Sequence, residues 1–322
     1  MPRLSILIPA FNARDFISQT INSVLAQTYT DWELIILEDR STDSTLQIGK
    51  EYSAKHPEKI KVYQNEKNLG MLENWNKGIS LCKSELFVKL DADDIWMPEF
   101  LQKSITILEK YPEVGLVFTK YLNIDERDAI ISDSEIILPD FANEKPFSTI
   151  PLVQMGEDKM LSFPILRQGL SVMRRNIFEE IGKYRYLLSK ETQAATDTEF
   201  YFRVGLHYKL YCINESLYKY RVHKASISRK DKDNQLSSQK IYEIKMSILK
   251  YYYEQGKIRK KEYFKNSSEV IFNYDVFLIQ FLFKREKIGE AINLLIKSLF
   301  LNPIKLSTFY LQRLINRWIV QK

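Results

Sequence analysis

Short apolar runs alternate with helical patterns over the first 121 residues. Each run is rich in leucine, isoleucine or valine, and the segment after it places apolar residues at helical spacing. The predicted strands are 4–8, 33–38, 60–65, 86–90 and 114–121, and the predicted helices are 15–27, 42–55, 71–81 and 98–111, with Ser41 or Thr42 as the cap of the second helix. Strands that alternate with helices through short links form a parallel, doubly wound sheet. The pattern therefore predicts an α/β fold.

Polar side chains follow four of these predicted strands. Because the carboxyl ends of parallel strands meet at one edge of a sheet, we expect these groups to line one crevice. An aromatic ring suits a nucleobase, amides and carboxylates suit a base or ribose, and carboxylates can hold a metal-bound diphosphate. The four segments are Pro9–Asn12, Glu38–Ser41, Asn65–Asn68 and Asp91–Asp94.

The last segment holds three carboxylates, Asp91, Asp93 and Asp94, directly after an apolar strand. Like charges this close repel each other, so a cation, hydrogen bonds or water must offset the cost. A solvated turn with a helix cap at Asp94 is the commoner meaning of such a tripeptide in isolation. The chain has neither G-x-x-x-x-G-K-[ST] nor G-x-G-x-x-G after a strand, so it lacks the glycine-rich phosphate loops. A metal ion at Asp91 and Asp93 is then the economical way to hold phosphate.

The alternation stops between residues 125 and 170 and returns after Gly169. The sequence predicts strands at 170–173, 209–213 and 217–222, a helical turn at 176–181 and a helix at 196–204. Thr196 is a suitable N-cap, which puts Asp197 in the first helical turn, where the helix dipole favours a carboxylate. An isolated aspartate at this position is most often only a helix-start residue.

Composition and cysteine placement limit the class of protein and its compartment. A hydrophobic content of 45% and a charged content of 27% exclude disordered and collagen-like chains. Cys82 and Cys212 lie in apolar or strand-like surroundings without a C-x-x-C pattern, so we expect buried thiols in a reducing compartment. The chain begins with a strand rather than a secretory signal, and it has no apolar window of spanning length. These features predict a cytoplasmic protein.

Basic charge is concentrated in the last quarter of the chain. Residues 240–322 contain 16 Lys and Arg against 7 Asp and Glu. Helices are predicted at 241–255, 260–284, 288–300 and 305–320. The last of these has an apolar stripe that includes Trp318, opposite Arg313 and Arg317, and such a helix can lie on an anionic membrane surface. Packing on its own domain is the alternative, so localisation is predicted as cytoplasmic with an optional contact at the inner face of the cell membrane.

Six segments, in order, resemble the inverting, GT-A fold nucleotide-sugar glycosyltransferases of family 2. The resemblance runs from Leu4 to about Ser228. It implies a GT-A domain (Rossmann-like, doubly wound, mostly parallel sheet) over 1–238, with a nucleotide-binding half at 1–124 and an acceptor-side half at 125–238. Residues 239–322 are then an α-helical C-terminal extension. The segments are Ser5–Asn12 (P-x-[YF]-N), Glu38–Asp43 (D-D-G-S-x-D), Asn68–Gly78 (N-x-G…N-x-G), Leu90–Asp94 (D-x-D), Thr196–Glu199 (the E-D region) and Tyr220–His223 (Y-R-x-H).

The resemblance assigns a nucleotide-binding role to the first strand ends. Phe11 would stack on the nucleobase, Asp39 would hydrogen-bond it, and Pro9 and Asn12 would shape the pocket. Asp91 would face the ribose or a metal-bound water.

The resemblance also implies a cation and a base. Asp93 would ligate Mn²⁺ or Mg²⁺, since hard oxygen ligands suit these ions, and Asp91 is its predicted partner. His223 is a candidate diphosphate or metal contact, whereas Arg221 would contact phosphate or pair with a carboxylate. Asp197 would accept the proton of the acceptor hydroxyl as it attacks the anomeric carbon, with inversion. Arg203, in mid-helix, is interpreted as structural.

The sequence departs from the family pattern at three points. Arg40 stands where glycine is usual, so the loop after Asp39 either changes its backbone conformation or lends a cation to the nucleotide. Thr196 replaces the usual acidic neighbour of the base. No Q-x-x-R-W segment follows, which favours transfer of one sugar per encounter over processive synthesis.

The predicted partners are a nucleotide-sugar donor, with uridine as the expected base, and a glycan or lipid-linked acceptor in cell-surface polysaccharide or glycoconjugate biosynthesis. No nucleic acid partner is expected. A nucleotidyltransferase is an alternative, but it should carry a glycine-rich basic loop where Pro9–Asn12 stands. A catalytically silent nucleotide- or membrane-binding module, tethered by its basic tail to membrane or nucleic acid, is the other alternative.

Overall fold

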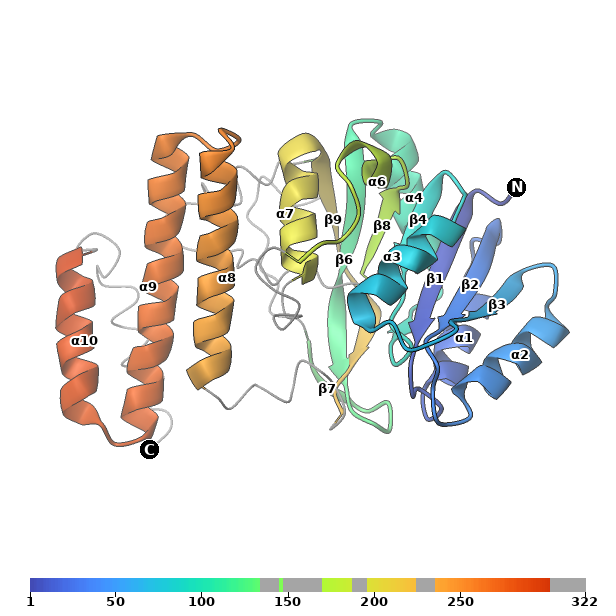
Figure 1. Ribbon diagram of the computed structural model, residues 1–322, viewed down its shortest axis with the longest axis horizontal. Coiled ribbons are helices and arrows are strands. Elements are labelled where there is room, and N and C mark those ends of the chain that lie inside the picture. Colours follow the sequence, from blue (N-terminus) through green and yellow to red (C-terminus); the bar gives the residue numbers. More distant parts are fainter. Residues whose placement is uncertain (134–144, 147–169, 187–195, 224–234, 302–322) are drawn as a thin grey trace. The chain divides into compact units, whose positions relative to one another are not determined.

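The computed structural model describes residues 1–133, 145–146, 170–186, 196–223 and 235–301 (Figure 1). The chain divides into two compact units. The first comprises Met1–Met155 and Lys159–Lys230, and the second comprises Gly156–Asp158 and Asp231–Lys322. The predicted division after residue 238 stays a prediction.

The first unit is built on one mixed sheet. Its strands are ordered β3-β2-β1-β4-β8-β6-β9-β5, and β7 pairs with β6 beside this path. Within the described residues, the strands are β1 (Leu4–Ala10), β2 (Trp32–Glu38), β3 (Ile60–Gln64), β4 (Leu86–Lys89), β5 (Ile95–Trp96), β6 (Val114–Ile124), β7 (Ile130–Asp133), β8 (Ser171–Arg174) and β9 (Lys209–Arg221).

Helices cover the sheet on both sides, with α3 in front of it and α1 behind it in Figure 1. The described helices of this unit are α1 (Ile17–Leu25), α2 (Thr45–Lys55), α3 (Met71–Leu81), α4 (Phe100–Lys110), α6 (Ile177–Glu180) and α7 (Thr196–His207). The helix α3 lies very close to β1, because a Cβ atom on Gly78 would stand 2.5 Å from a methyl group of Leu7. The predicted α/β fold is confirmed.

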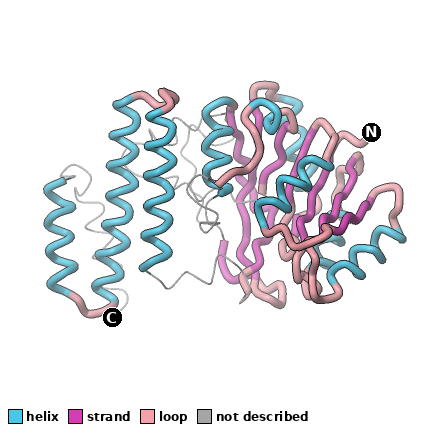
Figure 2. The backbone as a smooth tube through the Cα atoms, in the orientation of Figure 1, coloured by secondary structure: helices cyan, strands magenta, loops and turns pink. Residues whose placement is uncertain are grey.

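Strand direction decides where the polar loops gather. β1 pairs in parallel with both β2 and β4, and β6 pairs in parallel with β9. The strand β8 is antiparallel to both β4 and β6, so these two strands point the same way. The loops after β1, β2, β4 and β6 therefore lie along one edge, the lower one in Figure 2. The edge predicted from the sequence exists, although the sheet is mixed beyond β4.

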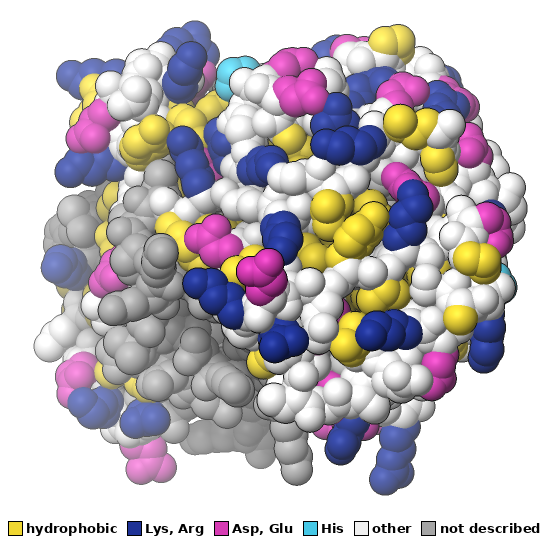
Figure 3. All heavy atoms as spheres, turned by 45° about the vertical axis from the view of Figure 1, so that its right-hand side comes forward, with side chains coloured by type: hydrophobic (Ala, Val, Ile, Leu, Met, Phe, Trp, Pro, Cys, Tyr) yellow, Lys and Arg dark blue, Asp and Glu magenta, His cyan; other side chains and the backbone are white. Residues whose placement is uncertain are grey.

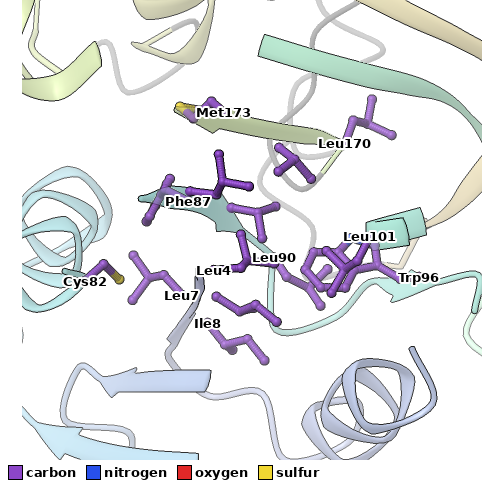
Figure 4. Packing of buried hydrophobic residues seen from close by; sticks show 14 of the residues in the cluster. Leu4, Leu7, Ile8, Cys82, Phe87, Leu90, Trp96, Leu101, Leu170 and Met173 are labelled. Atoms are coloured by element: carbon purple, nitrogen blue, oxygen red, sulfur yellow. The ribbon is translucent and has the colours of Figure 1, made fainter. Parts of the chain in front are cut away.

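The core of this unit consists of side chains from the central strands and the helices that cover them. Leu4, Leu7 and Ile8 of β1 lie against Phe87 and Leu90, as Figure 4 shows. Cys82 and Cys212 are buried free thiols, as predicted. Burial raises the pKa of each thiol to about 12.

Several local predictions were wrong. The helix α2 is not capped by Ser41 or Thr42; Asp43 instead accepts hydrogen bonds from the amide and hydroxyl of Thr45. The strand β9 is continuous where two pieces were predicted, because it pairs with β6 over most of its length through three register shifts. The short strands β5 and β7 were not predicted.

The second unit contains three described helices, α8 (Gln235–Glu254), α9 (Lys260–Lys284) and α10 (Ile288–Leu301). The helix α9 packs against both α8 and α10. Tyr242 and Tyr274 stack at 4.6 Å between α8 and α9. The bounds of α9 match the predicted ones, whereas the predicted helix 305–320 lies outside the described residues. Among the helices described, none combines the length and apolarity that crossing a membrane requires.

Candidate active site

Asp39, directly after β2, is buried and holds the loop that precedes α3. Its Oδ1 accepts hydrogen bonds from the Leu69 amide at 2.8 Å and from Asn65 Nδ2 at 2.7 Å. Its Oδ2 accepts one from the Gly70 amide at 2.9 Å. The chain carbonyl of Asp39 accepts a further bond from Asn68. The predicted contact of Asp39 with a nucleobase stays a prediction. The same carboxylate stabilises the loop before α3 by accepting the hydrogen bonds of Leu69 and Gly70.

The loop after β1 is joined to the loop after β2 by Asn12. The Asn12 amide donates to the hydroxyl of Ser41, and its Oδ1 accepts from the Thr42 amide, both at 2.9 Å. Phe11 beside it is 51% exposed, so its ring is open to a ligand. Pro9 is half-buried at the end of β1.

Arg40 keeps the backbone conformation that glycine would favour. Its φ of 61° lies in the left-handed region, which costs a non-glycine residue about 1 kcal/mol. Its side chain is exposed. The departure from the family pattern therefore leaves the left-handed turn in place and adds a cation at the edge of the loop.

Asp91 is paired with a buried lysine that sequence reasoning missed. Lys89 Nζ forms an ion pair with Asp91 Oδ1, and the lysine side chain is only 2% exposed. The same ammonium lies 4.4 Å from the centre of the Trp75 ring on α3. A lysine inside the apolar run Leu86–Leu90, two residues before an aspartate, was the available signal.

Asp93 and His223 are brought together from distant parts of the chain. Asp93 Oδ2 lies 2.9 Å from His223 Nε2. The His223 ring packs against Phe16 of the segment before α1, with ring centres 4.8 Å apart. Asp93 keeps about a third of its side chain exposed.

This pair fits a divalent cation, because a carboxylate oxygen and an imidazole nitrogen are both ligands that Mn²⁺ accepts. Within the described residues, no group of three or more acidic, histidine or cysteine side chains is gathered that could hold a metal by itself. Lys89 engages one oxygen of Asp91, and the predicted part of Asp91 in the metal site stays a prediction. Asp93 and His223 are the pair that would hold the ion.

Asp94 faces the protein interior. Its Oδ1 accepts a hydrogen bond from the Arg221 amide at 2.7 Å, and its Oδ2 accepts one from the Tyr218 hydroxyl. Burial, and then the charges of Asp93 and Asp91, raise the pKa of Asp94 well above its usual range. Asp94 thus fixes the loop to β9.

Arg221 is fully buried and joins four parts of the chain. Its guanidinium donates to the Asp93 carbonyl at 2.8 Å, to the Asp125 carbonyl at 3.0 Å and to Gln19 Oε1 at 2.7 Å. It also pairs with Asp128 at 2.6 Å. The predicted contact of Arg221 with phosphate stays a prediction, and its described partners all belong to the protein.

Asp197 lies in the first turn of α7, as predicted, and is partly exposed. Tyr184 and Tyr201, which we call the aromatic wall, are buried. Burial raises the pKa of both tyrosines, and the negative charges of Asp197 and Asp91 raise it further.

The wall is tied to α3 and α7. The Tyr184 ring meets Trp75 edge-on at 5.5 Å and Phe200 at 4.3 Å, and its carbonyl accepts a hydrogen bond from Asn76. Arg203 donates to the Lys183 carbonyl at 2.7 Å and pairs with Glu199 at 3.0 Å. These contacts confirm the structural role predicted for Arg203.

On the face shown in Figure 3, the basic and acidic side chains of the described residues are interspersed with exposed apolar ones.

Comparison with known proteins gives matches in both sequence and fold. The family model described as glycosyl transferase family 2 matches residues 5–182. An uncharacterized glycosyltransferase of Haemophilus influenzae is 30% identical over 226 residues, which are 69% of this chain and 66% of that protein. Chondroitin synthase of Escherichia coli is 35% identical over 133 residues, which are 41% of this chain and 19% of that protein.

Two solved structures share the fold at low sequence identity. S. aureus TarS 1-349 in complex with UDP aligns with a TM-score of 0.57 and 17% identity over 84% of this chain and 70% of that one. A mannosyltransferase of Pyrobaculum calidifontis in complex with GDP-Man and Mn²⁺ aligns with a TM-score of 0.58 and 14% identity over 99% of this chain and 80% of that one.

The sheet, its loop-bearing edge and these alignments define a glycosyltransferase of the GT-A fold. The family match covers more than half of the sequence. The chain belongs to glycosyl transferase family 2.

Proposed function

We propose that this protein transfers a single sugar from a nucleoside-diphosphate sugar, with UDP as the expected carrier, to a hydroxyl group of a glycan or lipid-linked acceptor. The transfer inverts the anomeric centre, depends on Mn²⁺ or Mg²⁺, and serves cell-surface polysaccharide or glycoconjugate synthesis at the cytoplasmic side of the membrane. The names of chondroitin synthase and of the teichuronic acid glycosyltransferase among its relatives support this proposal, as do structural neighbours bound to UDP, UDP-GlcNAc and GDP-Man.

One observation carries the proposal. Asp93 of the loop after β4 lies 2.9 Å from His223, which follows β9, at the edge of the sheet where the polar loops gather, in a chain that belongs to glycosyl transferase family 2. An oxygen ligand at this edge suits the cation of a nucleoside-diphosphate donor, and Asp197 in the first turn of α7 is the candidate base.

In the proposed reaction, Asp197 accepts the proton of the acceptor hydroxyl while the hydroxyl oxygen attacks the anomeric carbon. The bond between that carbon and the phosphate oxygen breaks, and the nucleoside diphosphate leaves. Phe11 binds the base, Asp91 receives ribose hydroxyls, and Asp93 with His223 holds the cation. When bound, the cation supplies Lewis-acid stabilisation of the charge that develops on the leaving diphosphate.

The test combines binding with turnover. The full chain is incubated with a panel of UDP- and GDP-sugars and Mn²⁺, and release of the nucleoside diphosphate is measured. We expect Asp197→Asn to lower the rate by about 10²–10⁴-fold, the range for loss of a general base, with UDP affinity kept within about twofold. Chelation of the metal should abolish turnover in both proteins.

Asp31→Asn serves as a matched control, because Asp31 is an exposed carboxylate before β2. It should leave both rate and affinity unchanged. Full activity of Asp197→Asn would overturn the assignment of the base. A chain that neither binds nor cleaves any nucleotide sugar would overturn the function.

A further inference from the structure

Lys89 is a buried cation without a role in the reaction proposed above. It lies in β4 between apolar neighbours and is 3% exposed as a residue. An ammonium group removed from water is costly unless an opposite charge and further polar contacts compensate it. Here it has the carboxylate of Asp91 on one side and the face of Trp75 on another. The strand therefore tolerates this lysine because Asp91 lies beside it.

The same contact constrains Asp91. The ammonium is held by the strand backbone and by the ring of Trp75, so it has little freedom to follow a moving partner. Trp75 is itself buried and meets Tyr184 edge-on at 5.5 Å. Asp91 Oδ1 is thus fixed against the protein, whereas about a third of the Asp91 side chain remains exposed.

A carboxylate already paired with a buried cation is a weakened metal ligand, since much of its charge is neutralised. It remains a good hydrogen-bond acceptor, because its second oxygen is not used by Lys89 in this pair. The carboxylate of Asp93 lies against His223 instead, and the buried guanidinium of Arg221 contacts the main-chain carbonyl of Asp93. The ion pair with Lys89 therefore makes Asp91 better suited to accept a hydrogen bond, and leaves Asp93 better suited to bind a metal ion.

We propose that Lys89 is a positioning residue that orients and neutralises Asp91, so that Asp91 receives a ribose hydroxyl of the donor nucleotide and the cation is left to Asp93 and His223. This inference rests on the proposed nucleotide-sugar function. It assigns Lys89 no direct contact with the donor.

The first experiment needs no ligand. Melting temperatures are compared for the wild type, Lys89→Met, Asp91→Asn and the double variant. Either single substitution breaks the ion pair and lowers the melting temperature. Because both lose the same interaction, the decrease in the double variant should be clearly smaller than the sum of the two single decreases. Additive losses would overturn the pairing.

The second experiment tests the ribose directly. Dissociation constants are measured for UDP and 2′,3′-dideoxy-UDP in the absence of metal. We expect the wild type to prefer UDP by about tenfold, Lys89→Met to reduce this preference below about threefold, and Lys89→Arg to retain most of it. Lys83→Met, at an exposed lysine, is the control and should keep the full preference.

If Lys89 had only a structural role, Lys89→Met would weaken the binding of UDP and of 2′,3′-dideoxy-UDP by the same factor and leave the preference for UDP intact. That result would overturn the proposal. Equal affinity of the wild type for the two nucleotides would also overturn it. If the wild type binds neither UDP nor GDP even when Mn²⁺ is added, the proposed function fails, and the melting temperatures still decide whether Lys89 pairs with Asp91. If Lys89→Met does not fold, Lys89→Gln replaces it in both experiments.

Discussion

The loops after β2 and β4 both present carboxylates at the same edge of the sheet, yet they are held in different ways. Asp39, after β2, is bonded to backbone amides of Leu69 and Gly70, only about 30 residues further along the chain. Asp93 and Asp94, after β4, are bonded to side chains and backbone of residues 218–223. The first loop is shaped by backbone dipoles, and the second by charges and rings that arrive from a distant strand.

The loop after β2 is held by uncharged groups, whereas the loop after β4 is held largely by charged ones. Amide groups that belong to a short loop fix Asp39 without adding a charge, so its position depends on the local chain conformation. The β4 loop instead depends on Arg221, His223 and Lys89, each of which carries or can carry a positive charge. Mutations should therefore affect the two loops in different measurements.

The largest effect is expected from Arg221→Met. Loss of this buried guanidinium removes the hydrogen bonds to the carbonyls of Asp93 and Asp125 and to Gln19, and it removes the ion pair with Asp128. Asp128 is 40% exposed, so the main loss comes from the buried hydrogen bonds of the guanidinium. Hydrogen bonds to charged groups are worth about 1.5–3 kcal/mol, and we expect the free energy of unfolding to fall by about 3 kcal/mol. Urea unfolding followed by tryptophan fluorescence reports this unit, which holds Trp32, Trp75 and Trp96.

The control for this change is Arg175→Met. Arg175 pairs with Glu179 at 2.5 Å on the surface of α6, and exposed pairs contribute less than about 1 kcal/mol. Equal losses in the two variants would show that the β4 loop does not depend on a distant buried cation.

A smaller loss is expected from Asp39→Asn. The substitution removes the charge and turns one acceptor into a donor that faces an amide of Leu69 or Gly70. Hydrogen bonds to charged groups are worth about 1.5–3 kcal/mol, so we expect a loss of about 2 kcal/mol in the same unfolding measurement. The effect should vary little with salt, because the partners carry no net charge. A loss below about 0.5 kcal/mol would contradict the role of Asp39 in shaping the loop.

Substitution of His223 should act on metal affinity with little effect on stability. His223→Ala removes the nitrogen that lies beside Asp93. We expect Mn²⁺ affinity in the presence of UDP to fall at least about tenfold, in line with losses seen when partners of a metal site are removed. Titration calorimetry measures this value. His207→Ala, at an exposed histidine in the last turn of α7, should leave it unchanged.

The smallest effects are expected from ionisation of the two thiols, which lie at two different strands of the sheet. Cys82 lies just before β4 and Cys212 lies in β9, and burial raises the pKa of both from 9 to about 12. The thiols of the unfolded chain therefore lose their protons at a lower pH than those of the folded protein. The free energy of unfolding should decline as the pH rises from 9 to about 12. Near pH 8, a disulfide reagent should modify the native thiols far more slowly than the unfolded ones.

The same reagent can sharpen the comparison of the loops. Arg221→Met should accelerate modification of Cys212 severalfold more than that of Cys82, because Arg221 ends the strand that carries Cys212. Equal acceleration of both thiols would indicate that the unit opens as a whole.

The sequence predicted the part of the fold that local pattern determines. The strands β1, β2 and β4 are buried apolar runs, and the bounds of α3 and α9 match the prediction because apolar spacing and flanking polar residues mark both ends. The predicted gathering of strand ends at one edge followed from the parallel pairing. The short strands β5 and β7 were missed because two or four residues carry no usable periodicity, and their pairing depends on β9 and β6.

Within the site, residue types could be predicted, but partners could not. Asp93 and His223 were both candidates, and only the fold shows that they lie beside each other. Arg221 is buried and contacts Gln19 and Asp128. These residues are far from it in the sequence, and no local pattern predicts the contacts. Lys89 was the one signal available and overlooked, since a charged residue inside a buried strand requires a nearby counter-charge.

The pairing of β5 with β9 also determines the order in which this edge can form during synthesis. β1 to β4 can pair with one another, and Lys89 can reach Asp91, as soon as the first 90 or so residues have left the ribosome, because these contacts all lie before β5 and only the pairing of β4 with β8 comes later. Asp93 and Asp94 must wait until residues 218–223 emerge. Domains generally fold from the N-terminal side during translation. The nascent chain therefore acquires the part of this edge built by β1 to β4 first, and carries two uncompensated carboxylates until β9 is inserted beside β6.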